Sequence, residues 1–201
     1  MITCAQEGVL DITRCLVMSI ALVLVFTGSA FSQHGAQIFG GYSYQRTGGE
    51  GVNGFNASVT GNIAPWVGIT GDFALHSKGT SVLEPNSGTL FNADAKLLSF
   101  MFGPQFTSHV NDTTSMFVHI LAGGYRASGN VASSGLGISV NSSGTGFSAA
   151  TGGGVDFRVA PRIAVRPIQI DWIHLGNTTL FGSDMGSSNG FRYSGGIVVR
   201  F

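Results

Sequence analysis

The residues of this chain that could do chemistry are mainly a small set of charged side chains in otherwise uncharged segments. They are Asp72, Asp156, Arg158, Arg166, Asp171, Arg192 and Arg200. Carboxylate and guanidinium groups removed from water are stable only when they are paired and hydrogen-bonded. We therefore expect these residues to form ion pairs that hold a closed structure together or, if the pairs exchange partners, a narrow gate for ions.

The histidines point to no catalytic or metal site. They are His34, His76, His109, His119 and His174. His76 is next to Ser77 and His174 is close to Asp171, but neighbours along a strand point to opposite faces. His119 has no second ligand at a metal-binding spacing, and the glycine clusters lack the strand-to-helix context of a phosphate-binding loop. We therefore expect no catalytic, cofactor-binding or metal-binding residue and no enzyme activity.

The composition excludes several classes of protein. Of 201 residues, 31 are Gly and only 20 are charged, with ten basic and ten acidic residues cancelling. A neutral chain lacks the basic surface needed to bind nucleic acid, and 43% hydrophobic residues exclude a disordered chain. So little charge is also unusual for a protein that faces water on all sides.

The N-terminal segment is typical of a secretory signal peptide. Residues 16–26 form an apolar run, and Ala30 and Ser32 stand at the positions that a signal peptidase requires. As a helix, this run would span only about 16 Å, roughly half a bilayer core, which argues against the alternative of a membrane anchor. We predict a signal peptide over 1–32 and one domain over 33–201.

The remainder of the chain alternates with period two, which is typical of β-strands with two different faces. In residues 55–63, for example, Phe, Ala, Val, Gly and Ile alternate with Asn, Ser and Thr. The eight predicted strands cover about 37–44, 55–63, 66–76, 93–106, 115–126, 147–159, 163–174 and 190–201.

The strand at 163–174 contains a break in this alternation. Arg166 stands at an even position before Pro167, whereas Gln169 and Asp171 stand at odd positions after it. A one-residue slip at Pro167 keeps all three polar side chains on one face. A β-bulge supplies such a slip and also tolerates a proline within a strand.

Short and long connections alternate between the predicted strands. The short ones lie at 63–65, 108–112 and 160–162. The long ones are rich in Gly, Ser, Thr and Asn and lie at 47–53, 77–91, 127–146 and 176–189. Short periplasmic turns at one end and long extracellular loops at the other are the layout of an outer-membrane barrel.

The two strand faces indicate which solvent each one meets. One face is apolar with aromatic residues near the strand ends, and the other carries Asn, Ser, Thr, Gly and the balanced charges. A soluble lipocalin-like barrel, the alternative, would carry a charged outer face. Because a sheet crosses lipid only as a closed barrel, we predict an all-β fold: an eight-stranded antiparallel up-and-down transmembrane β-barrel.

Two stretches resemble the outer-membrane barrel family that includes the transmembrane domain of outer membrane protein A. Residues 152–172 are similar to its sixth and seventh strands, and residues 193–201 resemble the C-terminal signal read by the barrel-assembly machinery. The resemblance implies that this signal consists of Tyr193, Ile197, Val199 and Phe201. The peptidoglycan-binding domain of larger members has no counterpart here, so no cell-wall tether is expected.

The resemblance implies export to the bacterial outer membrane, contact with outer-membrane lipids and a monomeric state. The expected function is a structural role in membrane integrity, either alone or together with a narrow ion pore. The alternative is a surface adhesin that binds through the loops at 77–91 and 127–146, because loops on a rigid scaffold commonly carry binding sites. A remote alternative is a lipid-modifying outer-membrane enzyme.

Overall fold

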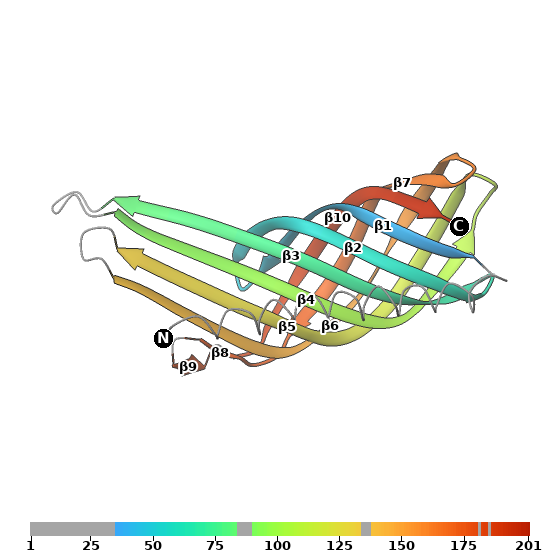
Figure 1. Ribbon diagram of the computed structural model, residues 1–201. Helices are drawn as coiled ribbons and strands as arrows, with labels where there is room; N and C mark the ends of the chain where they lie inside the picture. The colour runs from blue at the N-terminus through green and yellow to red at the C-terminus, as the bar shows by residue number, and fades with distance from the viewer. Residues whose placement is uncertain (1–34, 84–89, 134–137, 181, 185) are drawn as a thin grey trace, which may run out of the picture.

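A computed structural model describes residues 35–83, 90–133, 138–180, 182–184 and 186–201 (Figure 1). The predicted signal peptide and its cleavage site lie outside these residues. Within them, no helix is long and apolar enough to cross a membrane.

Eight long strands form one closed antiparallel barrel, which confirms the predicted fold class. They are β1 (Ala36–Thr47), β2 (Glu50–Ala64), β3 (Val67–Leu83), β4 (Leu90–His109), β5 (Thr114–Ser133), β6 (Ile138–Ala160), β7 (Ile163–Leu175) and β10 (Ser188–Arg200). Each strand pairs with its neighbours along the chain, and β1 closes the ring by pairing with β10 from Gln37↔Arg200 to Thr47↔Gly190. The connection from β7 to β10 contains the small hairpin of β8 (Thr179–Leu180) and β9 (Ser183–Asp184).

The short turns lie where the sequence predicts them, but the first predicted long loop, at 47–53, is wrong. Residues 65–66, 110–113 and 161–162 join strands at one end of the barrel. At the other end, β1 and β2 are joined by Gly48 and Gly49 alone, instead of a loop over 47–53. Both glycines have positive φ, 61° and 88°, as a two-residue hairpin turn requires when its twist matches that of its strands.

The predicted loops at 77–91 and 127–146 are also wrong, because most of their residues belong to strands. The β3–β4 pairing runs to Leu83↔Leu90 and the β5–β6 pairing runs to Ser133↔Ile138. Four adjacent strands thus continue past the shorter ones as a sheet extension, which we define as residues 77–83, 90–96, 128–133 and 138–143 (Figure 1). The prediction was wrong because it relied on the Gly, Ser, Thr and Asn content, which is typical of loops. In the folded chain, the neighbouring strands satisfy the backbone hydrogen bonds of these residues.

The predicted β-bulge in β7 is confirmed. Both Pro167 and Ile168 point outward and are exposed. The register of β7 shifts against both neighbours, between Ser194 and Gly196 of β10 and between Val155 and Phe157 of β6. The slip places Arg166, Gln169 and Asp171 on the inner face.

The inside of the barrel, the lumen, is a packed core with apolar clusters towards its two ends. The cluster near the sheet extension consists of Met101, Leu121, Tyr125, Ala150, Ile173 and Leu175. The cluster near the short turns consists of Phe39, Ala164 and Val198. The facing of β5 could not be predicted, because both of its faces are apolar; its inner face presents Phe117, Leu121 and Tyr125. Polar side chains occupy much of the space between the clusters.

Candidate functional site

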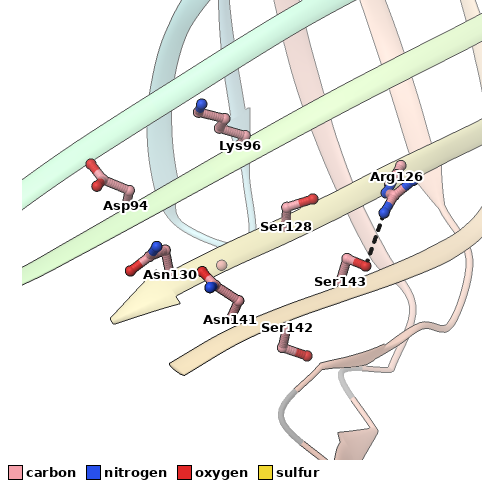
Figure 2. A pocket seen from close by; sticks show the side chains of 9 residues that line it. Asp94, Lys96, Arg126, Ser128, Asn130, Asn141, Ser142 and Ser143 are labelled. Atoms are coloured by element: carbon pink, nitrogen blue, oxygen red, sulfur yellow. Dashed lines mark hydrogen bonds between the residues drawn. The ribbon is translucent and has the colours of Figure 1, made fainter. Parts of the chain in front are cut away.

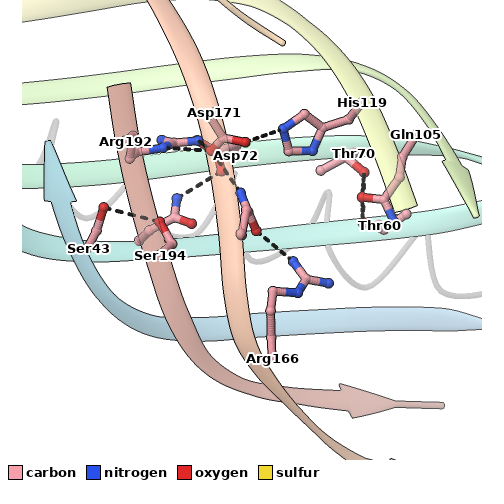
Figure 3. Close-up of polar contacts among 12 residues, drawn as sticks. Ser43, Thr60, Thr70, Asp72, Gln105, His119, Arg166, Asp171, Arg192 and Ser194 are labelled. Carbon is pink, nitrogen blue, oxygen red and sulfur yellow. Dashed lines mark hydrogen bonds and ion pairs between the residues drawn. The ribbon is translucent and has the colours of Figure 1, made fainter. Parts of the chain in front are cut away.

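Arg192 is the centre of the polar lumen. Its side chain is fully buried. Nε and Nη2 donate to Oδ2 of Asp171 at 3.0 and 2.8 Å, and Nη1 donates to Oδ1 of Asp72 at 2.7 Å (Figure 3). Asp171 is the register partner of Arg192 on the neighbouring β7, whereas Asp72 comes from β3. One guanidinium therefore connects β10 and β7 to β3, which pairs with neither of them.

The two carboxylates have further hydrogen-bond donors. Asp72 accepts from Nδ2 of Asn56 at 2.8 Å. Asp171 accepts from Nε2 of Gln169 at 2.9 Å and forms a 2.8 Å hydrogen bond with Nε2 of His119. These contacts occupy several of the oxygen lone pairs, as buried ionised groups require.

A second group of charges lies nearer the short turns. Arg166 donates to both oxygens of Asp156, from Nε at 2.7 Å and from Nη2 at 3.1 Å. Its Nη1 donates to Oε1 of Gln169 at 2.9 Å, so Gln169 connects the two groups. Arg200 donates from Nη2 to Asp156 at 3.2 Å and to Oγ of Ser115 at 2.8 Å.

Aromatic rings surround the Arg166 guanidinium. Its Cζ lies 4.5 Å from the ring centroid of Phe39 and 4.0 Å from that of Phe117. Both distances are within the range of cation–π attraction, which is stronger in a desolvated site. Sequence reasoning did not identify these two residues as part of the site.

The structure brings together six of the seven charged residues predicted to share the lumen. Three arginines and three aspartates balance in formal charge. Arg158 does not join them: its side chain is exposed. It lies beyond Asp156 near the turn to β7, where the β6–β7 register slips between Arg158 and Ala160. Alternation places Arg158 on the same strand face as Asp156, but it does not indicate that the lumen ends before Arg158.

Sequence reasoning missed the neutral members of the network. Asn56 and Gln169 stand on the polar faces of their predicted strands, so alternation could have identified them. His119 could not be assigned, because both faces of β5 are apolar. A second series of buried hydrogen bonds connects Thr60, Thr70 and Gln105. The two threonine hydroxyls are 2.7 Å apart, and the Thr70 hydroxyl donates to Oε1 of Gln105 at 3.0 Å (Figure 3).

The histidines do not form a common site. His76 points into the lumen, where its Nε2 is 3.0 Å from Oγ of Ser43, and both residues are fully buried. His174 points outward and its Nδ1 donates to Oδ1 of Asn189 at 2.7 Å. Within 35–83, 90–133, 138–180, 182–184 and 186–201, no three His, Cys, Asp or Glu residues are grouped so as to hold a metal ion.

The outer face of β3 to β6 changes from apolar to polar where the sheet extension begins. Cross-strand partners form rows on this face. The apolar row consists of Phe73, Phe100, Gly124 and Phe147. The row four residues further out consists of Ser77, Lys96, Ser128 and Ser143. This step covers roughly 13 Å along the strands, so the polarity changes over a short distance.

A shallow depression of about 410 Å³ lies on the polar part of this outer face (Figure 2). Arg126, Lys96 and Asp94 supply its charges, and serine and asparagine side chains line the rest. Nη2 of Arg126 donates to Oγ of Ser143 at 3.2 Å. The depression can therefore offer several hydrogen-bond donors to a polar partner.

The four residues of the predicted C-terminal assembly signal share the outer face of β10 and the residue that follows it. Tyr193, Ile197, Val199 and Phe201 are exposed by 40%, 55%, 37% and 69%. Alternation predicts this facing. The four side chains form an apolar ridge that is available from outside the barrel.

Comparisons with known proteins identify the fold. The sequence matches no protein-family model and no curated protein. Among solved structures, Ail, the attachment invasion locus protein of Yersinia pestis, matches 84% of this chain and 100% of its own chain at 22% identity and a TM-score of 0.56. Ail in complex with the heparin analogue sucrose octasulfate matches with a TM-score of 0.58 at the same identity and coverage. The outer membrane protein OprG of Pseudomonas aeruginosa matches 84% of this chain and 96% of its own at 11% identity and a TM-score of 0.49.

Proposed function

We propose that this chain is an outer-membrane barrel with a closed lumen, and that it makes contact with other surfaces through its sheet extension. The single observation that carries the contact role is the unequal length of the strands. β3 to β6 have 17, 20, 20 and 23 residues, whereas β1, β2, β7 and β10 have 12, 15, 13 and 13. Closing a barrel does not require the extra length, so the extension calls for a separate role.

The outer wall supports residence in a membrane. Its exposed side chains are largely apolar, and Trp66, Phe106, Tyr44 and Trp172 lie near the strand ends, where aromatic residues favour the membrane–water interface. Export by the predicted signal peptide and insertion by the barrel-assembly machinery would deliver the chain to the bacterial outer membrane as a monomer. The narrower resemblance to outer membrane protein A stays a prediction.

The packing of the lumen favours a closed plug over an ion pore. Arg192, Asp171, Asp72, Arg166 and Asp156 are each at most 3% exposed. An ion would have to break buried pairs, and breaking such a pair leaves an uncompensated charge at a cost of about 3–5 kcal/mol. A structural role in the membrane follows from the same packing. The narrow pore remains the second candidate, supported by the continuous polar network across the lumen.

The sheet extension supports contact with another surface. Four paired strands form a continuous sheet, and their outer face presents Lys96, Arg126, hydroxyl groups and amides. Ail, which shares this fold, is an attachment invasion locus protein and was solved with a heparin analogue. We propose attachment as the function of the extension, in place of the loops that the sequence predicts.

A shortened chain tests the attachment role without disturbing the barrel. Because Lys78 pairs with Ala95 and Gly129 pairs with Ser142, residues 79–94 and 130–141 can each be replaced by an Asn-Gly turn in register. Lys96→Gln and Arg126→Gln are added, because the shortening alone leaves these two cations in place. Bacteria displaying the full chain should adhere to matrix-coated and cell-coated surfaces more than bacteria displaying the shortened chain. Equal adhesion of both strains, with both barrels folded by heat-shifted mobility on gels, would contradict the role.

A catalytic role is not part of the proposal. His76 with Ser43 is buried in the lumen, and His174 with Asn189 is on the outer wall. The two pairs therefore cannot act on one substrate.

A further inference from the structure

The outer wall over β1, β10 and β7 contains a groove of about 530 Å³. Tyr44, Ile170, Trp172, Phe191 and Tyr193 supply its apolar surface. All five side chains point away from the lumen and are exposed by 38–63%. The groove therefore lies on the face that meets lipid in the proposed membrane barrel.

The strand register orders this groove from an apolar end to a polar one. Tyr44, Tyr193 and Ile170 are partners in one row. The next row outward consists of Arg46, Phe191 and Trp172. Beyond it, Asn189 pairs with His174, and their side chains are hydrogen-bonded. An amphiphile aligned with the strands would meet aromatic rings first and polar groups at the outer rim.

Arg46 is the charged residue at the polar end. Its side chain is exposed, and its guanidinium has no hydrogen-bond or ion-pair partner among the residues that the structure describes. Two other cations towards this end of the barrel differ in this respect, since Lys78 donates to Glu50 and Arg126 donates to Ser143. A free guanidinium offers a planar pair of donors that matches phosphate.

We propose that this groove binds one membrane lipid with a phosphate-bearing anionic headgroup. The acyl chain packs against Trp172, Phe191 and Tyr44. The phosphate accepts hydrogen bonds from Arg46. Because an anionic headgroup lacks the choline that offsets the phosphate charge in phosphatidylcholine, this guanidinium is the only cation beside the phosphate among the described residues and the lipid itself. Interfacial aromatic residues favour this depth of the bilayer. The proposal rests on the proposed membrane location but not on the attachment role. It assigns the lipid to the wall over β1, β10 and β7, whereas the sheet extension is formed by β3 to β6.

Lipid retention by the purified protein tests the proposal. The full chain is extracted from expressing cells in detergent and titrated with phosphatidylglycerol or phosphatidylcholine of the same acyl chains, and bound lipids are counted by native mass spectrometry. We expect one phosphatidylglycerol to bind about fivefold more tightly than phosphatidylcholine, the size of one exposed ion pair. Arg46→Gln should abolish this preference and Arg46→Lys should retain most of it.

Matched variants distinguish a lipid site from general charge effects. Arg126→Gln removes the same charge from the other side of the barrel and should leave the preference unchanged. Phe191→Ala should weaken both lipids alike, and free glycerol phosphate at the same concentration should not displace the lipid. The proposal is overturned if the wild type shows no headgroup preference, if Arg46→Gln keeps it, if Arg126→Gln loses it equally, or if glycerol phosphate displaces the lipid.

Discussion

At the scale of single residues, the lumen is held by a few arginines that each contact more than one strand. Arg192 joins β10 to β7 and β3, and Arg200 joins β10 to β5 and β6. A side chain that contacts strands on several sides restrains the barrel against distortion. The contribution of each arginine to the free energy of unfolding should therefore increase with the number of its buried contacts.

Replacing Arg192 by Met should strongly destabilise the protein. The change leaves Asp72 and Asp171 buried without their main cation, and removing one partner of a buried ion pair costs about 3–5 kcal/mol. The free energy of unfolding, measured in urea with lipid vesicles present, gives this value directly. Arg158→Met is the matched control, because this exposed side chain should change the free energy by less than about 0.5 kcal/mol. Similar losses for both variants would contradict the account of the lumen.

Much of this site could be predicted from residues alone, and the omissions have physical causes. Alternation placed Asp72, Asp171 and Arg192 on one face, and the need to pair buried charges brought them together. The same rule included Arg158, because parity does not say where the lumen ends. His119 was missed because β5 carries apolar residues on both faces, one towards lipid and one towards the lumen cluster.

At the scale of elements, the β7 bulge decides which residues of that strand enter the lumen. Two residues, Pro167 and Ile168, face the single residue Gly195 of β10. The hydroxyl of Tyr193 donates to the carbonyl oxygen of Pro167 at 2.6 Å. The bulge thus carries one surplus residue, and strict alternation holds on either side of it.

Two single-residue deletions in β7 should have opposite outcomes. Deleting Pro167 removes the surplus residue and keeps Arg166, Gln169 and Asp171 on the inner face, so the barrel should fold. Deleting Ile170 turns Asp171 towards lipid if the bulge is kept, and it turns Gln169 towards lipid and Ile168 into the lumen if the bulge is lost. A polar or charged side chain facing lipid is destabilising in both cases. Heat-shifted mobility on gels reports folding. Failure of the Pro167 deletion, or folding of the Ile170 deletion, would contradict the assigned bulge.

The sheet extension is the element that sequence patterns did not predict. Its Gly, Ser, Thr and Asn content is typical of loops, and no period-two contrast separates its faces. Cross-strand pairing, a property of the folded neighbours, decides its structure instead. Strand conformation for these residues has a direct consequence for their backbone amides.

Amides in the extension should be protected from hydrogen exchange. Residues 128–132 of β5 have paired strands on both sides, whereas residues 139–143 of β6 are beyond the β6–β7 pairing, which begins at Ser148↔Leu175. We expect slow exchange in the first segment and intermediate exchange in the second. Exchange of both segments at the rate of an unstructured chain would restore the loops that the sequence predicts.

At the scale of the whole molecule, the low charge and high glycine content reflect two different surroundings. The outer wall is largely apolar, and its charged residues lie mainly at the rim. Inside the lumen, the six charged residues balance one another. Glycine permits close approach where strands crowd: a Cβ on Gly41 would lie 2.2 Å from the carbonyl oxygen of Gly195. The neutral composition therefore describes how the barrel is built, and it argues against nucleic acid without identifying any other partner.

Planar-bilayer conductance of the purified chain tests the closed lumen most directly. The buried Arg192 and Arg166 networks predict no discrete current steps above the background of protein-free bilayers, at either polarity. Loosening the network by Arg166→Ala should at most introduce rare openings. Regular unitary steps from the wild-type chain, reduced or lost in Arg166→Ala, would contradict the closed lumen and establish the ion pore instead.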